Sequence, residues 1–216
     1  MLNFASNNSE TDPVDHISDV WDGSFVKRIP LYVQQKGAIL CFQIYMDEVE
    51  LSNPLGSKKG KHKVSVFYWV LMNLPPSFRS SLRCIQLLGI VNSELLKQRR
   101  VDVFLRHFLD DLIILHEGVT LNLRGEQRVW FGILLHFCGD IPAANFVGGF
   151  KEGVGFANLP CRSCMISRDS LDEYQVKEVE KEGLTKTARE AVSTRYGVNR
   201  GCLFRALSYF DPTKCF

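Results

Sequence analysis

Two carboxylates stand where largely apolar stretches of this chain end. Asp47 follows the stretch 38–46, and Asp140 follows the stretch 129–138 after one glycine. Ligands of open α/β sheets collect beyond the ends of such buried strands. Paired carboxylates there suit two divalent cations, Mg²⁺ or Mn²⁺, which activate a nucleophile and stabilise the leaving oxygen in phosphodiester cleavage. A carboxylate at a strand end also serves as a solvated turn residue, and the spacing alone leaves both interpretations open.

A second chemical motif is the cysteine pair Cys161 and Cys164. The C-x-x-C spacing lets the backbone present two thiolates to one tetrahedral Zn²⁺, which makes half of a zinc site. All five histidines precede residue 137, so the further ligand candidates in this chain are Cys202 and Cys215. The alternative is a pair of reduced thiols in a tight turn.

The densest positive cluster is a turn that contains Lys58, Lys59, Lys61, His62 and Lys63. Lysines on such a turn can contact the phosphates of DNA. The alternative is a solvated hairpin turn.

The composition is that of an ordinary globular protein. With 216 residues, 45% of them apolar and 23% charged, the chain can bury one sizeable core. The formal net charge is only +2, so nucleic-acid binding would depend on a local basic patch.

The cysteines and the apolar stretches indicate a cellular compartment. Seven cysteines without a cationic, apolar leader favour a reducing environment, nuclear or cytoplasmic, over secretion. Charged residues interrupt the longest apolar stretch, 101–115, so no segment approaches the ~20 residues of a membrane span. An intracellular protein without a membrane partner is expected.

Hydrophobic periodicity predicts the elements that position these residues. Strands are expected at 38–46, 62–72, 83–91 and 129–138, the first three as an antiparallel meander. Between them, at 93–118, the apolar period changes to about 3.6, which predicts a helix capped by Ser93 and ended by Gly118. A helix that joins two strands favours parallel pairing, so the fourth strand is expected beside the first.

This order is the opening of the ribonuclease H-like fold, an α/β class built on a mixed sheet. It would bring Asp47 and Asp140 onto adjacent strands. The expected domains are a disordered lead-in at 1–20, an incomplete core at 21–165, and a charged, partly helical extension at 166–216. The extension ends in an apolar, aromatic stretch, which predicts a truncated chain.

Five short phrases in order resemble the motifs of CACTA (En/Spm)-type DDE transposases. They are DEVE at 47–50, NPLGS at 53–57, NLPP at 73–76, GDIPA at 139–143 and PCRSC at 160–164. The resemblance covers roughly residues 20–216. It implies a ribonuclease H-like catalytic core, a divalent metal, and cleavage and transfer of DNA strands at transposon ends.

Residue by residue, Asp47 resembles the first catalytic acid of that family and Asp140 the second. Glu48 and Glu50 share the first acidic cluster and are alternatives to Asp47. The third acid of the family, a glutamate late in the core, has no matching motif here.

The resemblance therefore implies a transposase-like protein whose enzymatic activity is lost with the third acid. DNA is the expected partner, Mg²⁺ or Mn²⁺ the expected cofactor, with Zn²⁺ and self-association as further expectations. The alternative is a non-enzymatic DNA- or protein-binding module derived from a transposase. A nuclease that uses the same acids is not separated from these by sequence.

Overall fold

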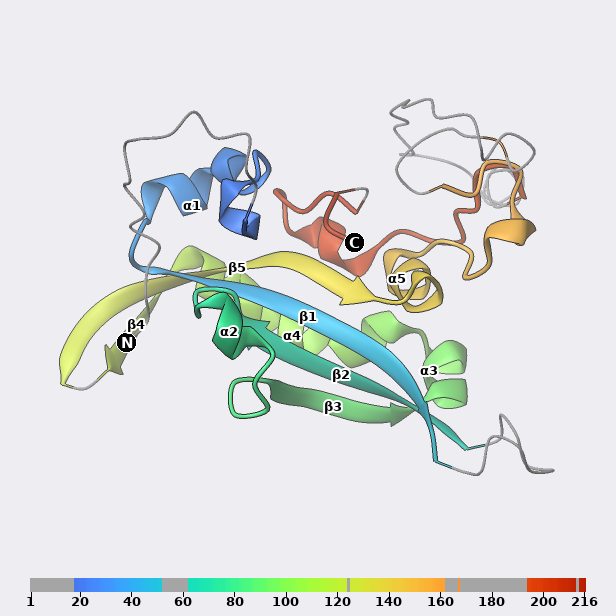
Figure 1. The fold of residues 1–216 in the computed structure, drawn as a ribbon, viewed down its shortest axis with the longest axis horizontal. Coiled ribbons are helices and arrows are strands. Elements are labelled where there is room, and N and C mark those ends of the chain that lie inside the picture. Colours follow the sequence, from blue (N-terminus) through green and yellow to red (C-terminus); the bar gives the residue numbers. More distant parts are fainter. Residues whose placement is uncertain (1–17, 52–61, 124, 162–166, 168–193, 213) are drawn as a thin grey trace. The chain divides into compact units, whose positions relative to one another are not determined.

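The computed structural model describes residues 18–51, 62–123, 125–161, 167, 194–212 and 214–216. Within these residues the chain forms a mixed α/β structure (Figure 1). The strands are β1 (Ile39–Glu50), β2 (Lys63–Leu71), β3 (Gln86–Asn92), β4 (Val119–Leu123) and β5 (Glu126–Gly139). The α-helices are α1 (Pro30–Gln34), α2 (Pro76–Arg79), α3 (Ser93–Arg99), α4 (Val101–Glu117) and α5 (Ile141–Gly148). Short 3₁₀ helices include η1 (Val20–Asp22), η2 (Val26–Arg28), η3 (Val154–Phe156) and η5 (Leu203–Ala206).

The five strands form one curled, mixed sheet in the order β3-β2-β1-β5-β4. β1 and β2 run antiparallel: the amide of Leu51 donates to the carbonyl of His62 at 2.9 Å, and the amide of Met72 donates to the carbonyl of Cys41 at 2.8 Å. β5 lies beside β1 and parallel to it. The prediction that the strand at 129–138 lies beside the first strand and parallel to it is therefore confirmed.

β1 is longer than its apolar stretch predicts. It continues to Glu50, so the acidic residues 47–50 belong to the strand and do not follow it. Pairing with β2 explains the extension, because the hydrogen bond from Leu51 to His62 closes the ladder beyond the last acid. Each of these side chains consequently points to one of the two faces of the sheet.

The helical segment is two helices, where the sequence pattern predicts one. Arg100, with φ of 70°, separates α3 from α4. The predicted cap at Ser93 is wrong: Asn92 is the N-cap, and its side chain accepts a hydrogen bond from the amide of Leu95 at 3.0 Å. The buried hydroxyl of Ser93 instead pairs with that of Ser65 at 2.9 Å. Gly118 follows the last helical residue with φ of 106°, as the prediction required.

β4 is a strand that the periodicity did not predict. It pairs antiparallel with the start of β5, from Val119 opposite Trp130 to Leu123 opposite Glu126. Gly125 lies in the turn with φ of 85°, a conformation that glycine adopts without strain. The hairpin also explains why β5 begins three residues before the predicted strand.

The chain divides into two compact units that share the long strands and α4. Unit 1 comprises the described parts of Met1–Ile44, Tyr68–Gly89 and His107–His136. Unit 2 comprises the described parts of Tyr45–Phe67, Ile90–Arg106 and Phe137–Phe216. The expected division at residues 20 and 165 stays a prediction.

Aromatic side chains mark the core of each unit. In unit 1 the ring of Phe42 lies 5.4 Å from that of Trp69 and 6.4 Å from that of Phe108 on α4. In unit 2 Phe104 of α4 packs on Phe67 of β2, with ring centroids 4.7 Å apart. The stripe of α4 thus packs on the sheet, as its helical period predicts.

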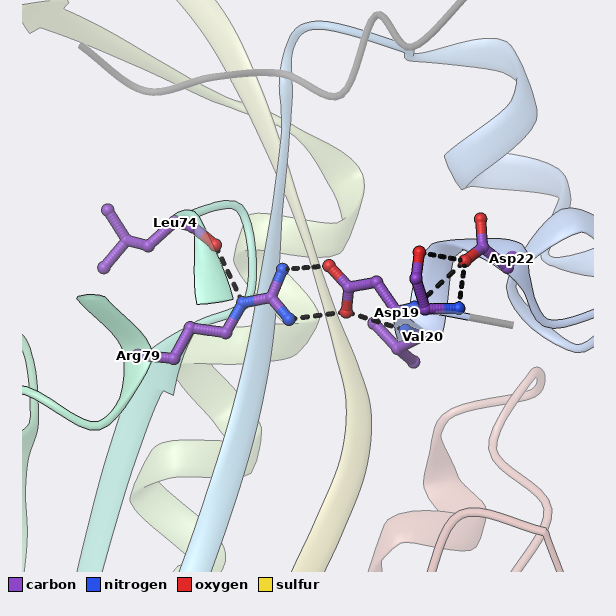
Figure 2. Close-up of polar contacts among 6 residues, drawn as sticks. Asp19, Val20, Asp22, Leu74 and Arg79 are labelled. Carbon is purple, nitrogen blue, oxygen red and sulfur yellow. Dashed lines mark hydrogen bonds and ion pairs between the residues drawn. The ribbon is translucent and has the colours of Figure 1, made fainter. Parts of the chain in front are cut away.

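Within unit 1, an ion pair joins the segment before β1 to α2 (Figure 2). The guanidinium of Arg79 on α2 donates to both carboxylate oxygens of Asp19, at 2.6 and 2.7 Å, and its Nε donates to the carbonyl of Leu74 at 2.7 Å. Asp19 also accepts a hydrogen bond from the amide of Val20 at 2.7 Å, which caps η1. The hydrogen bond from Arg79 holds the pKa of the Asp19 carboxyl below its ordinary value, although partial burial opposes this.

Candidate functional site

A small pocket of about 40 Å³ lies in unit 2, near the C-terminal ends of β1 and β5. It has room for a few water molecules or one small ion, since one water needs ≳ 10–15 Å³. The residues that line it include three carboxylates and one ammonium group. The lining residues are Met46, Glu48, Lys97, Asp140, Pro142, Ala143, Phe146 and Glu152.

The pleat of β1 decides which acid of the 47–50 cluster reaches this pocket. Met46 and Glu48 line it. Successive residues of a strand point to opposite faces, so Asp47 and Val49 point away, and both are exposed. Glu50 shares the face of Glu48 but lies beyond the lining residues. Of the three predicted alternatives, Glu48 is therefore the one that shares a pocket with Asp140.

Asp140 enters the pocket as the N-cap of α5, the helix that directly follows β5 (Figure 1). Its Oδ1 accepts a hydrogen bond from the amide of Ala143 at 2.8 Å. The sequence explains this local structure, because an aspartate followed by Ile141 and Pro142 is a typical helix start. One carboxylate oxygen thus has a structural role, and the group still borders the pocket.

Gly139 allows the end of β5 to lie close to β1. A Cβ atom at this position would be 3.1 Å from the Cβ of Ala143 and 3.2 Å from the carbonyl oxygen of Met46. A larger residue would push these segments apart. The Gly-Asp pair thus brings Asp140 to the strand that carries Glu48.

Lysines neutralise much of the negative charge at the pocket. The ammonium of Lys97 on α3 lies 3.6 Å from Oε1 of Glu48 and 3.2 Å from Oε2 of Glu152. The ammonium of Lys63 lies 3.4 Å from the other oxygen of Glu48. Burial by itself would lower the pKa of Lys97, but the hydrogen bonds and charges of Glu152 and Glu48 together raise it above its ordinary value. Lys97 is therefore charged at neutral pH.

The donor chemistry of the pocket suits a hard divalent cation. Glu48, Asp140 and Glu152 offer carboxylate oxygens, which are the ligands that Mg²⁺ and Mn²⁺ prefer. Among the described residues, however, no three acidic, histidine or cysteine side chains lie close enough together to hold one ion. Metal binding would require the three carboxylates to converge.

Glu152 and Lys97 are pocket residues that the sequence analysis missed. Glu152 lies in the glycine-rich connection after α5, and Lys97 lies 55 residues earlier, in the last turn of α3. No local pattern links the two residues, because a cation in the last turn of a helix is ordinary.

Most of the predicted DNA-binding loop lies outside the described residues. Lys58, Lys59 and Lys61 fall there, so their role stays a prediction. Lys63 is described: it is the first residue of β2, and it pairs with Glu48.

The predicted zinc motif is described only in part. Cys161 is half-buried, and Cys164 lies outside the described residues. The candidate partners Cys202 and Cys215 are both buried. Phenylalanines from the same C-terminal segment, Phe204, Phe210 and Phe216, form an aromatic cluster with Phe137. Burial raises the pKa of the Cys202 thiol to about 11 and that of Cys215 to about 12. Both thiols are therefore protonated at neutral pH when no metal ion binds them.

None of the described helices is long and apolar enough to cross a membrane. When the chain was compared with models of protein families and with curated proteins, neither comparison gave a match.

Proposed function

We propose that this chain is a transposase-like protein of the CACTA (En/Spm) DDE type, built on a ribonuclease H-like core. Its ancestral activity would be metal-dependent cleavage and transfer of DNA strands at transposon ends. One observation carries the proposal: Glu48 and Asp140 line the same pocket although 92 positions separate them in sequence. The parallel neighbours β1 and β5 bring the two acids together near the carboxyl ends of these strands, where ligands of α/β proteins collect.

In this proposal Glu48 and Asp140 hold Mg²⁺ or Mn²⁺, and Glu48 takes the role first assigned to Asp47. A bound divalent cation would stabilise the negative charge that develops on phosphate oxygens during cleavage. Asp140 keeps its capping bond to Ala143, which fixes the orientation of its carboxylate toward the pocket.

We further propose that the chain is inactive as an enzyme. No motif of the sequence matches the third acid of the family, and lysines engage two of the three pocket carboxylates: Glu152 pairs with Lys97, and Glu48 pairs with Lys97 and Lys63. An incomplete set of carboxylates that already pairs with lysines is a poor site for two cations.

The lysines at Glu48 favour the alternative function, a DNA-binding module without catalysis. Lys63 and Lys97 are both about half-exposed, with 42% and 46% of their side chains accessible. They can exchange a carboxylate partner for a phosphate. DNA binding of this kind weakens steeply as salt is added, because phosphate contacts release counterions.

The test combines a metal titration with two DNA assays on the purified full chain. Binding of Mn²⁺ is measured for the wild type and for Glu48→Gln, Asp140→Asn and Asp47→Asn. Asp47→Asn is the matched control, since it removes one charge from the neighbouring residue on the opposite face. We expect the first two substitutions to weaken Mn²⁺ binding and the control to leave it unchanged. Equal effects of Glu48→Gln and Asp47→Asn would contradict the proposed site.

The DNA assays separate the enzyme from the binding module. Supercoiled plasmid with Mn²⁺ reports strand cleavage, and we expect no nicking above background. Nicking that Asp140→Asn abolishes would show an active enzyme and overturn the claim of inactivity. A fluorescent 30-base-pair duplex reports binding, and we expect its affinity to fall steeply between 50 and 200 mM salt. Absence of binding at low salt would exclude the DNA-binding module.

A further inference from the structure

The solvent-exposed side of α4 carries two large apolar side chains with charged residues between them. Val103 and Ile114 are 66% and 58% exposed, whereas Leu105 and Leu109 on the other side of the helix are fully buried. Four exposed residues lie between the two apolar ones, namely Arg106, His107, Asp110 and Asp111. Together these six exposed residues form the outer face of α4. All six belong to one continuous helix, so their arrangement follows from the geometry of α4 alone.

The outer face is symmetric along the helix. Val103 and Ile114 lie at equal separations from its midpoint, which falls between positions 108 and 109. His107 and Asp110 also lie at equal separations from that point. The basic residues of the face all precede the midpoint, and the acidic residues all follow it. Positions 103, 107, 110 and 114 are separated by four, three and four residues, a spacing that keeps them on one side of a helix.

We propose that the outer face binds a second copy of this chain, so that two α4 helices pack antiparallel around a two-fold axis. In this arrangement Val103 of each copy contacts Ile114 of the other copy. Arg106 of each copy lies beside Asp110 of the other, and His107 lies beside the acids that follow the midpoint. A two-fold axis makes each contact occur twice, because both copies use the same surface. The inference goes beyond the proposed function, since no residue of α4 is among those that line the pocket.

The order of charges along α4 determines that the pairing is antiparallel. A parallel pair would place Arg106 beside Arg106 and Asp110 beside Asp110, and like charges in contact disfavour association. The antiparallel pair replaces these repulsions by attractions, and it also aligns the two helix dipoles favourably. Among the described residues, no ion pair engages Arg106, Asp110 or Asp111, so these charges are available to a second molecule.

The apolar contacts supply the other part of the binding energy. At both ends of the outer face an exposed valine meets an exposed isoleucine, and the contact removes both from water. With 17 residues, α4 is only about 25 Å long, so a single pair of helices buries a small area. Small interfaces are weak, and we expect a dissociation constant on the order of 10–100 µM.

Sedimentation velocity of the full chain between about 5 and 500 µM measures this association. The wild type should change from monomer to dimer over that range. Arg106→Glu and Asp110→Arg each turn two attractions into two repulsions, and each should raise the dissociation constant at least about tenfold. Arg83→Glu is the matched control, because it makes the same charge change at an exposed position outside α4. It should leave the dissociation constant within about twofold of the wild-type value.

A mixture of the two α4 variants tests the contact between copies directly. In a dimer of one copy of each variant, the introduced carboxylate faces the introduced guanidinium, and the native Asp110 faces the native Arg106. We therefore expect an equimolar mixture of Arg106→Glu and Asp110→Arg to dimerise as the wild type does, although each variant alone should be monomeric. Circular dichroism checks that each variant is folded.

A wild type that stays monomeric at about 500 µM would overturn the proposal. A dimer that Arg106→Glu weakens no more than Arg83→Glu does would also overturn it, as would a mixture of the two α4 variants that fails to associate. None of these outcomes bears on the metal site, which the Mn²⁺ titration tests separately.

Discussion

The ion pair between Asp19 and Arg79 should make a measurable contribution to stability, and Asp19→Asn is the substitution that isolates it. Asparagine keeps the size of the side chain and an oxygen that can cap η1. It removes the charge that receives the two hydrogen bonds of Arg79, at 2.6 and 2.7 Å (Figure 2). Arg79 keeps its bond to the carbonyl of Leu74, so the guanidinium does not lose every partner.

The solvent exposure of the two side chains determines how much stability Asp19→Asn is expected to remove. The two side chains are 14% and 19% exposed, so the pair is neither fully solvated nor fully buried. Exposed pairs contribute about 0–1 kcal/mol, and breaking a buried pair costs about 3–5 kcal/mol. A bidentate, partly buried pair lies between these limits, and we expect Asp19→Asn to lower the free energy of unfolding by about 2 kcal/mol.

The same pair should make the stability of the protein fall as the solution becomes acidic. The hydrogen bond from Arg79 lowers the pKa of Asp19 below the ordinary value of 3.8. A depressed pKa in the folded state stabilises the protein fully above the unfolded pKa, and this stabilisation is lost as the pH falls through the folded pKa. The difference in stability between the wild type and Asp19→Asn should therefore be constant near neutral pH and shrink below a pH of about 4.

Urea unfolding followed by tryptophan fluorescence provides the assay. Trp21 stacks on Tyr32 with ring centroids 5.6 Å apart, and the guanidinium of Arg79 lies 5.9 Å from the Trp21 ring. Fluorescence therefore reports on this segment. Lys214→Ala is the control, because it removes an exposed pair with Asp211 and should change stability by less than about 0.5 kcal/mol. Equal effects of the two substitutions, or a difference that persists unchanged at pH 2.5, would refute the reasoning.

Two further predictions concern positions away from the pocket and the ion pair. Gly149→Ala should destabilise the protein by about 2–3 kcal/mol in urea unfolding, because its φ is +83° and a Cβ would clash with the backbone carbonyl oxygen of Arg200. Gly201→Ala, where nothing lies within 4 Å, should change stability by less than about 0.5 kcal/mol, and similar losses at both positions would contradict this account. Burial raises the pKa of three thiols to about 11 or 12, so they should resist iodoacetamide at pH 8 until denaturant is added; they are Cys41, Cys202 and Cys215. Peptide mass spectrometry checks this, and rapid alkylation of all three in the native protein would show that they are not buried.

Local sequence patterns were sufficient to predict several helices and strands of the fold. Nearly continuous apolar stretches located β1 and β5, as expected for strands with largely buried central residues. The alternation of apolar residues located β2, and a short apolar stretch located β3. The stripe that includes Val101 and Leu105 located α4, and Gly118 ended it. The weak alternation of β4 was missed, because the stability of a short edge strand comes from its partner in the hairpin.

Which residues line the pocket could not be predicted from the sequence, because it depends on the tertiary structure. Sequence identified Asp140 and a cluster of three acids as candidates, but it could not choose among the three. The choice depends on the length of β1 and on which of its faces is covered, since a shift of one residue reverses every side chain. Glu48 faces the pocket and Asp47 does not.

Sequence by itself determined the types of residue available: carboxylates near two strand ends, lysines nearby, and a glycine that permits close approach. Only the tertiary structure decided that Lys97 and Glu152, 55 positions apart, share an ion pair at the pocket. Local patterns extend over a few turns or one strand, whereas this charge pairing joins segments that only the folded chain brings together. The set of carboxylates that lines the pocket, and the lysine that pairs with two of them, therefore depend on long-range contacts.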